Sequence, residues 1–295
     1  MNENEQLQQI RERIDSLDVQ IQELINQRAS AAQDVARVKR SEDKDAFFYR
    51  PEREAEVLAA VKARNLGPLG DEEMTRLFRE IMSACLALEQ PLRIAFLGPE
   101  GTFTQSAALK HFGHSVQTVA LNSIPDIFRD VESGSCNYGV VPVENSTEGV
   151  ISHTLDMFLN SGLQICGEVT LRIHHHLMSK ERELGSITKV YSHQQSLGQC
   201  RLWLDRNMHK VELYPVGSNA EAARLAGSDA NSAAIAGEMA AEIYGLDILA
   251  DSIEDEPDNT TRFLIIGPLC LPASVNDKTT LLLSARNVAG SLIAL

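Results

Sequence analysis

The first forty residues carry the apolar pattern of one long α-helix. Neither glycine nor proline interrupts residues 5–40, and a helix of about 35 residues is about 50 Å long. Because that length exceeds most small domains, we expect it to pack against a partner helix, which another chain could supply. The apolar or small residues recur at spacings of three and four: Leu7, Ile10, Ile14, Leu17, Ile21, Leu24, Ala31, Val35 and Val38.

Two shorter helices are predicted before residue 91. Pro51 suits the first turn of a helix that runs to about Asn65, and the segment 65–70 predicts a turn. Asp71 is expected to cap a third helix, which Pro91 ends. Its apolar residues share one stripe: Met74, Leu77, Phe78, Ile81, Cys85 and Leu88.

Beyond Pro91, short apolar runs alternate with helical segments, which is typical of an α/β domain. The runs are 94–97, 140–143, 190–191, 233–236 and 263–266. Several runs end at a turn that is expected to lead into a helix, at 98–104, 144–149, 192–196 and 218–219. Helix N termini expose unpaired N–H groups, so such turns, if they line one cleft, would bind an anion. We expect two lobes with the site between them.

A last segment begins near Lys278. Residues 279–284 predict a strand, and the residues from Arg286 onward predict the start of a helix. A segment of this length is too short for a domain, so the sequence is expected to be a fragment of a longer protein.

Charge and composition exclude several classes of protein. The 295 residues include 27 Lys and Arg against 41 Asp and Glu, a net charge of −14. This charge repels phosphate backbones and anionic lipid, so we expect neither nucleic acid nor membrane as a partner. There is no apolar run of about 18 residues and no secretory signal. Five scattered cysteines without a C-x-x-C motif indicate reduced thiols in a cytoplasmic protein.

Three basic residues of the first helix are candidate anion ligands. Arg28 lies on the apolar stripe, where it could instead form a buried salt bridge or set the register. Lys39 lies on the same face about 16 Å further on, so the two side chains could hold one small dianion. Arg11 lies about 25 Å before Arg28. If Arg11 and Arg28 serve one site for a small metabolite, they must come from different chains.

Two sets of motifs resemble known enzyme families. Residues 1–91 are similar to the all-helical chorismate mutases. The segments that carry this similarity are IRERIDSLD (10–18), QR (27–28), VK (38–39) and RPERE (50–54). Residues 92–270 resemble the prephenate dehydratases, on GPEGTF (98–103), VPVEN (141–145), YSHQ (191–194) with Gln199, and NTTRF (259–263). Together they resemble the bifunctional chorismate mutase–prephenate dehydratases of bacterial phenylalanine biosynthesis.

The resemblance implies a fold of three parts. An all-α mutase domain of three helices, dimeric, precedes a two-lobed α/β dehydratase domain similar to periplasmic binding proteins. Residues 278–295, with AGSL at 289–292, resemble the incomplete start of an ACT regulatory domain. L-phenylalanine is then expected as an effector of the full-length protein only, because the family's second phenylalanine-binding segment would lie beyond Leu295.

The resemblance also implies residues that rearrange chorismate to prephenate without nucleophile, metal or cofactor. Arg11 of the partner chain and Arg28 would hold the substrate carboxylates. Lys39 would donate to the ether oxygen, and Glu54 would accept from the ring hydroxyl. Three further positions of this site depart from the family pattern: Arg50 replaces an acidic residue, Cys85 a small hydroxyl residue and Glu89 a glutamine.

For the dehydratase, the resemblance implies loss of the ring hydroxyl and CO2 from prephenate to give phenylpyruvate. Thr261 would donate to the departing hydroxyl. Asn145, Ser192 and Gln199 would bind the substrate carboxylates or hydroxyl, and Glu144 is a candidate for positioning or proton handling. Without the resemblance, Asn145 and Ser192 could be ordinary helix caps.

Other residues have structural interpretations. Arg262 follows Thr261 on a strand, so its side chain is expected on the opposite face. His174 and His176 share a strand face, yet adjacent histidines without a carboxylate pattern indicate structure more than a metal site. The G-x-x-G at 98–101 is not a dinucleotide fingerprint, which disfavours a nicotinamide cofactor and the sibling fusion with prephenate dehydrogenase.

The alternative function is a cytoplasmic small-molecule sensor with a helical dimerisation stalk and a two-lobed anion-binding domain. Such a sensor would not need Arg11, Arg28, Lys39 and Glu54 together. The expected partners are therefore chorismate, prephenate and a second copy of the chain, in a homodimer with shared mutase sites.

Overall fold

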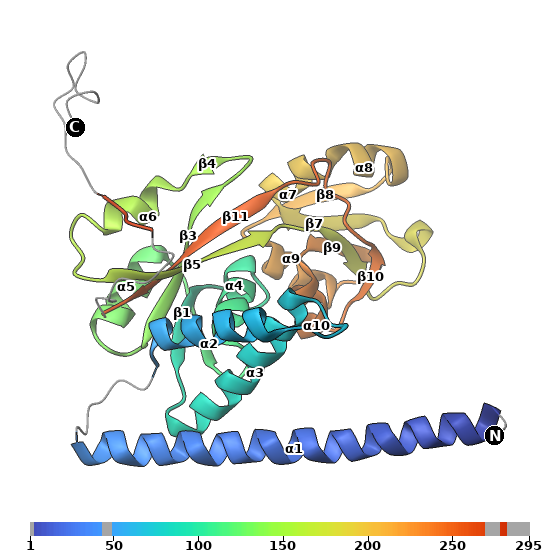
Figure 1. Cartoon of the computed structure of the whole chain (residues 1–295). Coiled ribbons are helices and arrows are strands. Elements are labelled where there is room, and N and C mark those ends of the chain that lie inside the picture. Colours follow the sequence, from blue (N-terminus) through green and yellow to red (C-terminus); the bar gives the residue numbers. More distant parts are fainter. Residues whose placement is uncertain (1–2, 43–48, 269–277, 282–295) are drawn as a thin grey trace, which may run out of the picture.

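The computed structural model describes residues 3–42, 49–268 and 278–281, as three helices followed by a domain of two sheets (Figure 1). The ACT-like segment predicted for 278–295 lies outside the described residues apart from 278–281, which form no helix or strand. In the described part of the chain, every helix is too short or too polar to cross a bilayer.

Helix α1 (Glu3–Glu42) is the single long helix that the apolar period predicts. Ala36, in its C-terminal half, is 4% exposed, and this half packs on α3. Residues 3–27 are all exposed, so the apolar stripe there contacts little of its own chain: Ile10 is 55% exposed and Leu24 63%. Figure 1 shows α1 as a straight rod along one side of the molecule.

Helix α3 (Asp71–Glu89) packs on α1 and pairs with the antiparallel helix α2 (Pro51–Arg64). The predicted cap at Asp71 is wrong, because Gly70 in an extended conformation (φ −65°, ψ 157°) precedes the helix. Asp71 is the first helical residue, and its carboxylate accepts the amide of Asn65 across the turn at 2.8 Å. Its negative charge still favours the helix N terminus from this position.

The first lobe of the second domain is a sheet in the order β2-β1-β3-β11-β5, with β4 paired to β3. The strand β11 reaches this sheet from the far end of the sequence and lies antiparallel between β3 and β5. The elements are β1 (Arg93–Leu97), α4 (Phe103–Phe112), β2 (Gln117–Leu121), α5 (Ile124–Glu132), β3 (Tyr138–Asn145), β4 (Gly149–Val150), α6 (Ser152–Met157), β5 (Gln164–Arg172) and β11 (Thr260–Gly267).

The second lobe is a sheet in the order β10-β6-β9-β7-β8. Two crossover segments, 173–175 and 251–259, join the lobes, and the five predicted apolar runs are all strands. The elements are β6 (His176–Ser179), η1 (Leu184–Ser186), β7 (Lys189–His193), α7 (Gln194–Gln199), α8 (Arg201–Asn207), β8 (Glu212–Val216), α9 (Asn219–Ala226), β9 (Ser232–Ala236), α10 (Glu238–Tyr244) and β10 (Asp247–Ala250).

Three of the four predicted strand–turn–helix junctions are confirmed, at α4, α7 and α9. The prediction for 144–149 is wrong, because this segment is a hairpin between β3 and β4. The side-chain oxygen of Asn145 accepts the backbone N–H groups of Thr147 (3.0 Å) and Glu148 (3.2 Å). An Asx turn of this kind reverses the chain and competes with a helix start.

The helical domain is joined to the first lobe where α3 meets the end of α4. Glu80 accepts the backbone N–H of His114 at 3.0 Å and contacts its Nδ1 at 2.8 Å. Gly113 ends α4 with φ +77°, and a Cβ there would lie 2.5 Å from the Cβ of Ser83. The junction therefore requires glycine both for its backbone conformation and for the close approach of α3.

Replacing Gly113 by alanine tests this junction. We expect Gly113→Ala to lower the free energy of unfolding by about 2–4 kcal/mol, from the left-handed backbone and the clash with Ser83. Gly134→Ala is the matched control, since Gly134 has φ +74° with open space around its Cβ, and should cost about 1–2 kcal/mol. Urea unfolding measures both, and equal losses would show that the contact with Ser83 contributes nothing.

Candidate active sites

The first candidate site lies where the end of α3 meets the C-terminal half of α1. The charges of Lys39, Arg28 and Arg40 all act on the carboxyl group of Glu89, and the Arg40 guanidinium donates to the Glu89 backbone carbonyl. Burial raises the pKa of Glu89 above its ordinary value, although the three cations oppose this shift. The structure thus brings together three predicted site residues: Arg28, Lys39 and Glu89.

A second carboxylate, which the sequence analysis missed, lies near this cluster. Glu52 in the first turn of α2 accepts the Arg50 side chain at 2.7 Å. Burial raises the pKa of Glu52, but the hydrogen bond from Arg50 and the charges of Arg50 and Lys39 hold it below the ordinary value. Arg50 stands where the family pattern has an acidic residue, and Glu52 supplies a negative charge in its place. The sequence offers one signal that Glu52 belongs to the site, which is its place after Pro51 at the helix start, two residues before Glu54.

Glu54 and Cys85 are more enclosed than Arg50. The Glu54 carboxylate lies 3.5 Å from the Arg79 guanidinium and is hydrogen-bonded to Tyr49. Burial raises the pKa of Glu54, against the lowering effects of Arg79 and Tyr49. Cys85 is 3% exposed and lies one helical turn before Glu89, on the same side of α3.

Arg11 is remote from this cluster within one chain. It is exposed on the N-terminal half of α1, and the helix is uninterrupted between Arg11 and Arg28. The two residues are therefore about 25 Å apart along the axis, and a single chain does not place both on one small ligand.

The second candidate site lies on neighbouring strands of the first lobe. Thr261 on β11 is directly opposite Asn145 on β3, so the two side chains share one face of the sheet. The Asn145 amide donates to Thr261 Oγ1 (2.8 Å) and to Asn259 Oδ1 (2.9 Å). Its oxygen accepts the Thr147 hydroxyl at 2.5 Å. Both amide hydrogens of Asn145 are thereby engaged.

Gln199, at the end of α7, reaches this group from the second lobe. Its amide oxygen accepts from Asn259 Nδ2 at 3.2 Å, and its Nε2 donates to the Thr147 hydroxyl at 3.2 Å. Asn259 is 2% exposed, whereas Thr147 is exposed, so the group is open to solvent on one side. Asn259 and Thr147 were missed as site residues. Asn259 stands in the NTTRF motif, but nothing in the sequence singles out Thr147.

Two predicted residues lie away from this group. Glu144 forms an ion pair with Arg262 (3.3 Å) on the face of the sheet opposite Thr261; the expected position of Arg262 is confirmed. Ser192 is fully buried, and its hydroxyl contacts the Ile235 carbonyl at 2.8 Å and Asn219 Oδ1 at 3.0 Å, within the second lobe.

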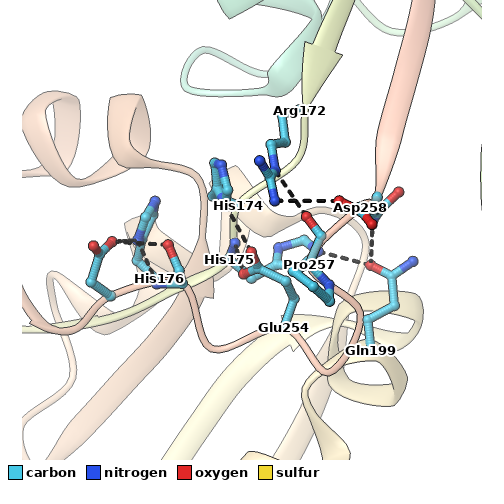
Figure 2. A network of polar contacts seen from close by, with 11 residues as sticks. Arg172, His174, His175, His176, Gln199, Glu254, Pro257 and Asp258 are labelled. Carbon is cyan, nitrogen blue, oxygen red and sulfur yellow. Dashed lines mark hydrogen bonds and ion pairs between the residues drawn. The ribbon is translucent and has the colours of Figure 1, made fainter.

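The three adjacent histidines tie the two crossover segments together, as Figure 2 shows. His174 Nδ1 lies 2.7 Å from the Glu254 carboxylate, and His176 Nδ1 lies 2.6 Å from Asp251. Only His175 turns toward the second candidate site, with Nε2 2.8 Å from the Gln199 side-chain oxygen. His174 and His176 therefore each contact a carboxylate of the 251–259 segment, although the sequence shows no carboxylate pattern around them.

Comparison with known proteins gives matches along most of the chain. Residues 10–90 match the family described as chorismate mutase type II, and residues 94–269 match prephenate dehydratase. A bifunctional chorismate mutase/prephenate dehydratase of Stutzerimonas stutzeri is 58% identical over 99% of this chain and 81% of its own length. One from Pseudomonas aeruginosa is 57% identical with the same coverage.

Solved structures also resemble the second domain. The crystal structure of prephenate dehydratase from Arthrobacter aurescens, in complex with L-Phe, superposes with a TM-score of 0.59 at 29% identity, over 68% of this chain and 70% of that one. The prephenate dehydratase of Staphylococcus aureus gives a TM-score of 0.54 at 29% identity, over 61% and 67% of the two chains.

Proposed function

Because the chain belongs to the family of bifunctional chorismate mutase/prephenate dehydratases, we propose how its residues divide the two reactions. The enzyme rearranges chorismate to prephenate and converts prephenate to phenylpyruvate, as part of phenylalanine biosynthesis. In this proposal, residues 1–91 form the mutase domain, residues 92–270 the dehydratase domain and residues 278–295 part of an ACT domain, in a cytoplasmic protein. A sensor role would not account for two enzymatic domains.

The mutase reaction needs a folded substrate and stabilisation of charge on the breaking ether oxygen. Arg28 holds a substrate carboxylate, and Lys39 donates to the ether oxygen. The charges of both cations act on the Glu89 carboxyl group, and as a neutral acid Glu89 can donate a second hydrogen bond to that oxygen. Glu54, held by Arg79 and Tyr49, accepts from the ring hydroxyl. Arg50, paired with Glu52, and the buried Cys85, one helical turn before Glu89, are the other two departures from the family pattern.

The mutase site is completed by Arg11 of a second chain. The exposed apolar stripe of α1 supports this dimer, because isolated apolar residues are ordinary on a surface but a continuous stripe indicates an interface. An antiparallel pairing of two such helices would bring the N-terminal half of one beside the C-terminal half of the other. The roughly 25 Å between Arg11 and Arg28 is then spanned by two chains.

The hydrogen bond from Asn145 to Thr261 carries the dehydratase proposal. Thr261 Oγ1 accepts an N–H from Asn145 at 2.8 Å, so the hydroxyl's own hydrogen is directed elsewhere and is available to the leaving hydroxyl of prephenate. As the C–O bond breaks, the electron pair of the ring–carboxylate bond moves into the ring and CO2 departs. The hydroxyl leaves with the C–O electron pair as hydroxide, hydrogen-bonded by Thr261, and takes a proton from solvent to become water. Thr261 is 9% exposed, and a buried, oriented donor stabilises the departing group better than water does.

The remaining polar residues bind substrate or hold its ligands in place. Gln199 keeps one amide hydrogen for a substrate carboxylate, because its oxygen and its other hydrogen are engaged. Asn145 acts by orienting Thr261, since both its amide hydrogens are used. Ser192 ties the end of β7 to β9 and to the start of α9, and Glu144 positions Arg262 on the opposite face.

Mixing two inactive variants tests the shared mutase site. Arg11→Ala and Arg28→Ala should each lower the mutase rate by about 100-fold or more, because each removes a carboxylate ligand. Unfolded and refolded together, they should regain about a quarter of wild-type activity, since half of randomly formed dimers are mixed and each has one intact site. Refolding each variant alone is the control. Mixed dimers that form without activity would rule out the shared site.

Substitution of Thr261 should separate the two activities. Thr261→Ala should lower dehydratase turnover by about 100-fold or more, because the oriented donor is lost, while the mutase rate stays within a few-fold. Thr261→Ser keeps the hydroxyl and should retain much of the turnover. Thr260→Ala, on the adjacent residue, is the matched control. Comparable loss of both activities in Thr261→Ala would point to misfolding instead of chemistry.

The mutase should prefer acidic conditions because Glu89 donates only when protonated. Its pKa is raised by burial, and the protonated fraction falls as pH rises through that pKa, so mutase kcat/KM should fall between about pH 5 and 8. Glu89→Gln donates at every pH and should give a flatter profile at constant ionic strength. Parallel profiles for the two proteins would remove Glu89 from the mechanism.

A further inference from the structure

The middle histidine of the 174–176 triplet is held more firmly than its neighbours. His175 is 2% exposed, its backbone N–H donates to the Glu254 carboxylate at 2.9 Å, and its carbonyl accepts the N–H of Ile253 at 2.8 Å. Its ring and the Phe103 ring of the GPEGTF motif meet edge to face, with ring centroids 5.7 Å apart. Both crossover segments, which Figure 2 shows, and Phe103 at the start of α4 therefore fix the direction of this ring.

The orientation of the side-chain amides near His175 is anchored on backbone groups. Asn145 Oδ1 accepts the backbone N–H groups of Thr147 and Glu148, which cannot reverse their polarity. The Asn145 amide nitrogen must then face Asn259 Oδ1, and Asn259 Nδ2 must face Gln199 Oε1. The oxygen of Gln199 is thereby assigned to the side that His175 contacts.

This assignment fixes the state of the His175 ring. An amide oxygen only accepts, so His175 Nε2 at 2.8 Å from Gln199 Oε1 carries the hydrogen. Among the described residues, Nδ1 is buried without a hydrogen-bond partner, so a second ring hydrogen would be unsatisfied there. Burial accordingly lowers the pKa of His175, and the ring is a neutral donor from Nε2.

The donor matters because Gln199 could otherwise rotate. With His175 and Asn259 both donating to Oε1, the NH2 group of Gln199 is directed toward Thr147 and the open side of the site. Without the His175 donor, only the 3.2 Å bond from Asn259 would hold this oxygen. A half-turn of the amide would then present oxygen to an anionic substrate, which repels it. We propose that His175 is a positioning residue of the dehydratase, which holds the Gln199 amide with its N–H toward the substrate.

The proposal rests on the proposed role of Gln199 in the dehydratase, and a double-mutant cycle tests it. His175→Leu should lower dehydratase kcat/KM by about 10- to 100-fold while leaving the mutase rate near wild type. His175→Gln places an amide N–H where Nε2 was and should recover activity to within a few-fold. In a Gln199→Leu background, His175→Leu should cost little more, because both changes remove one interaction. His174→Asn keeps a donor for Glu254 and is the matched control.

The outcomes separate the positioning role of His175 from the proposed role of Gln199. Suppose that Gln199→Leu is impaired and that the double variant loses the product of the two single-variant losses. This result would overturn the positioning role of His175 and leave the proposed role of Gln199 intact. The positioning role would also be overturned if His175→Gln were as impaired as His175→Leu, or if His175→Leu kept the wild-type rate. If His175→Leu loses both activities through misfolding, the His175→Gln comparison decides. Wild-type turnover in Gln199→Leu would refute the proposed role of Gln199, and the positioning role with it, whatever Thr261→Ala shows.

Discussion

The dehydratase domain depends on the pairing of β3 with β11, strands separated by more than a hundred residues. β11 is central in the first sheet, with Phe263, Ile265 and Ile266 almost fully buried, so the apolar core fixes which residues face which side. Side chains alternate between the two faces along a strand. If the register of β11 shifted by one residue, Arg262 would face the site in place of Thr261. The same pairing returns the chain to the first lobe after the second lobe is complete, and thereby closes the two lobes around the site.

The two sites use different physical means for two anionic substrates. The mutase cluster holds formal charges on helices, with Lys39 and Arg28 acting on Glu89. The dehydratase group is built from neutral amides and hydroxyls whose orientation is set by one another and finally by backbone N–H groups. Oriented neutral donors need no rearrangement as charge develops, which suits a reaction whose main demand is on one departing hydroxyl.

The sequence predicted the elements with strong local patterns and the residues in dense motifs. The period of α1 and the five apolar runs correspond to observed elements, because burial imposes a repeat on consecutive residues. Local patterns failed where a single side chain decides the outcome. The Asx turn at Asn145 produced a hairpin in place of a helix start, and Gly70 replaced Asp71 at the cap. Thr147 joins the site through the Asx turn at Asn145 and through Gln199 of the other lobe, and neither contact is visible as a local pattern.

The most direct test of the account is a crystal structure of the enzyme with an unreactive prephenate analogue that retains the ring hydroxyl. We expect Thr261 Oγ1 at hydrogen-bond distance from that hydroxyl, about 2.8 Å, with Asn145 still donating to Thr261 and with an N–H of Gln199 donating to a substrate carboxylate. An analogue whose hydroxyl faces Glu144 and Arg262, or contacts Asn145 with Thr261 turned away, would contradict it.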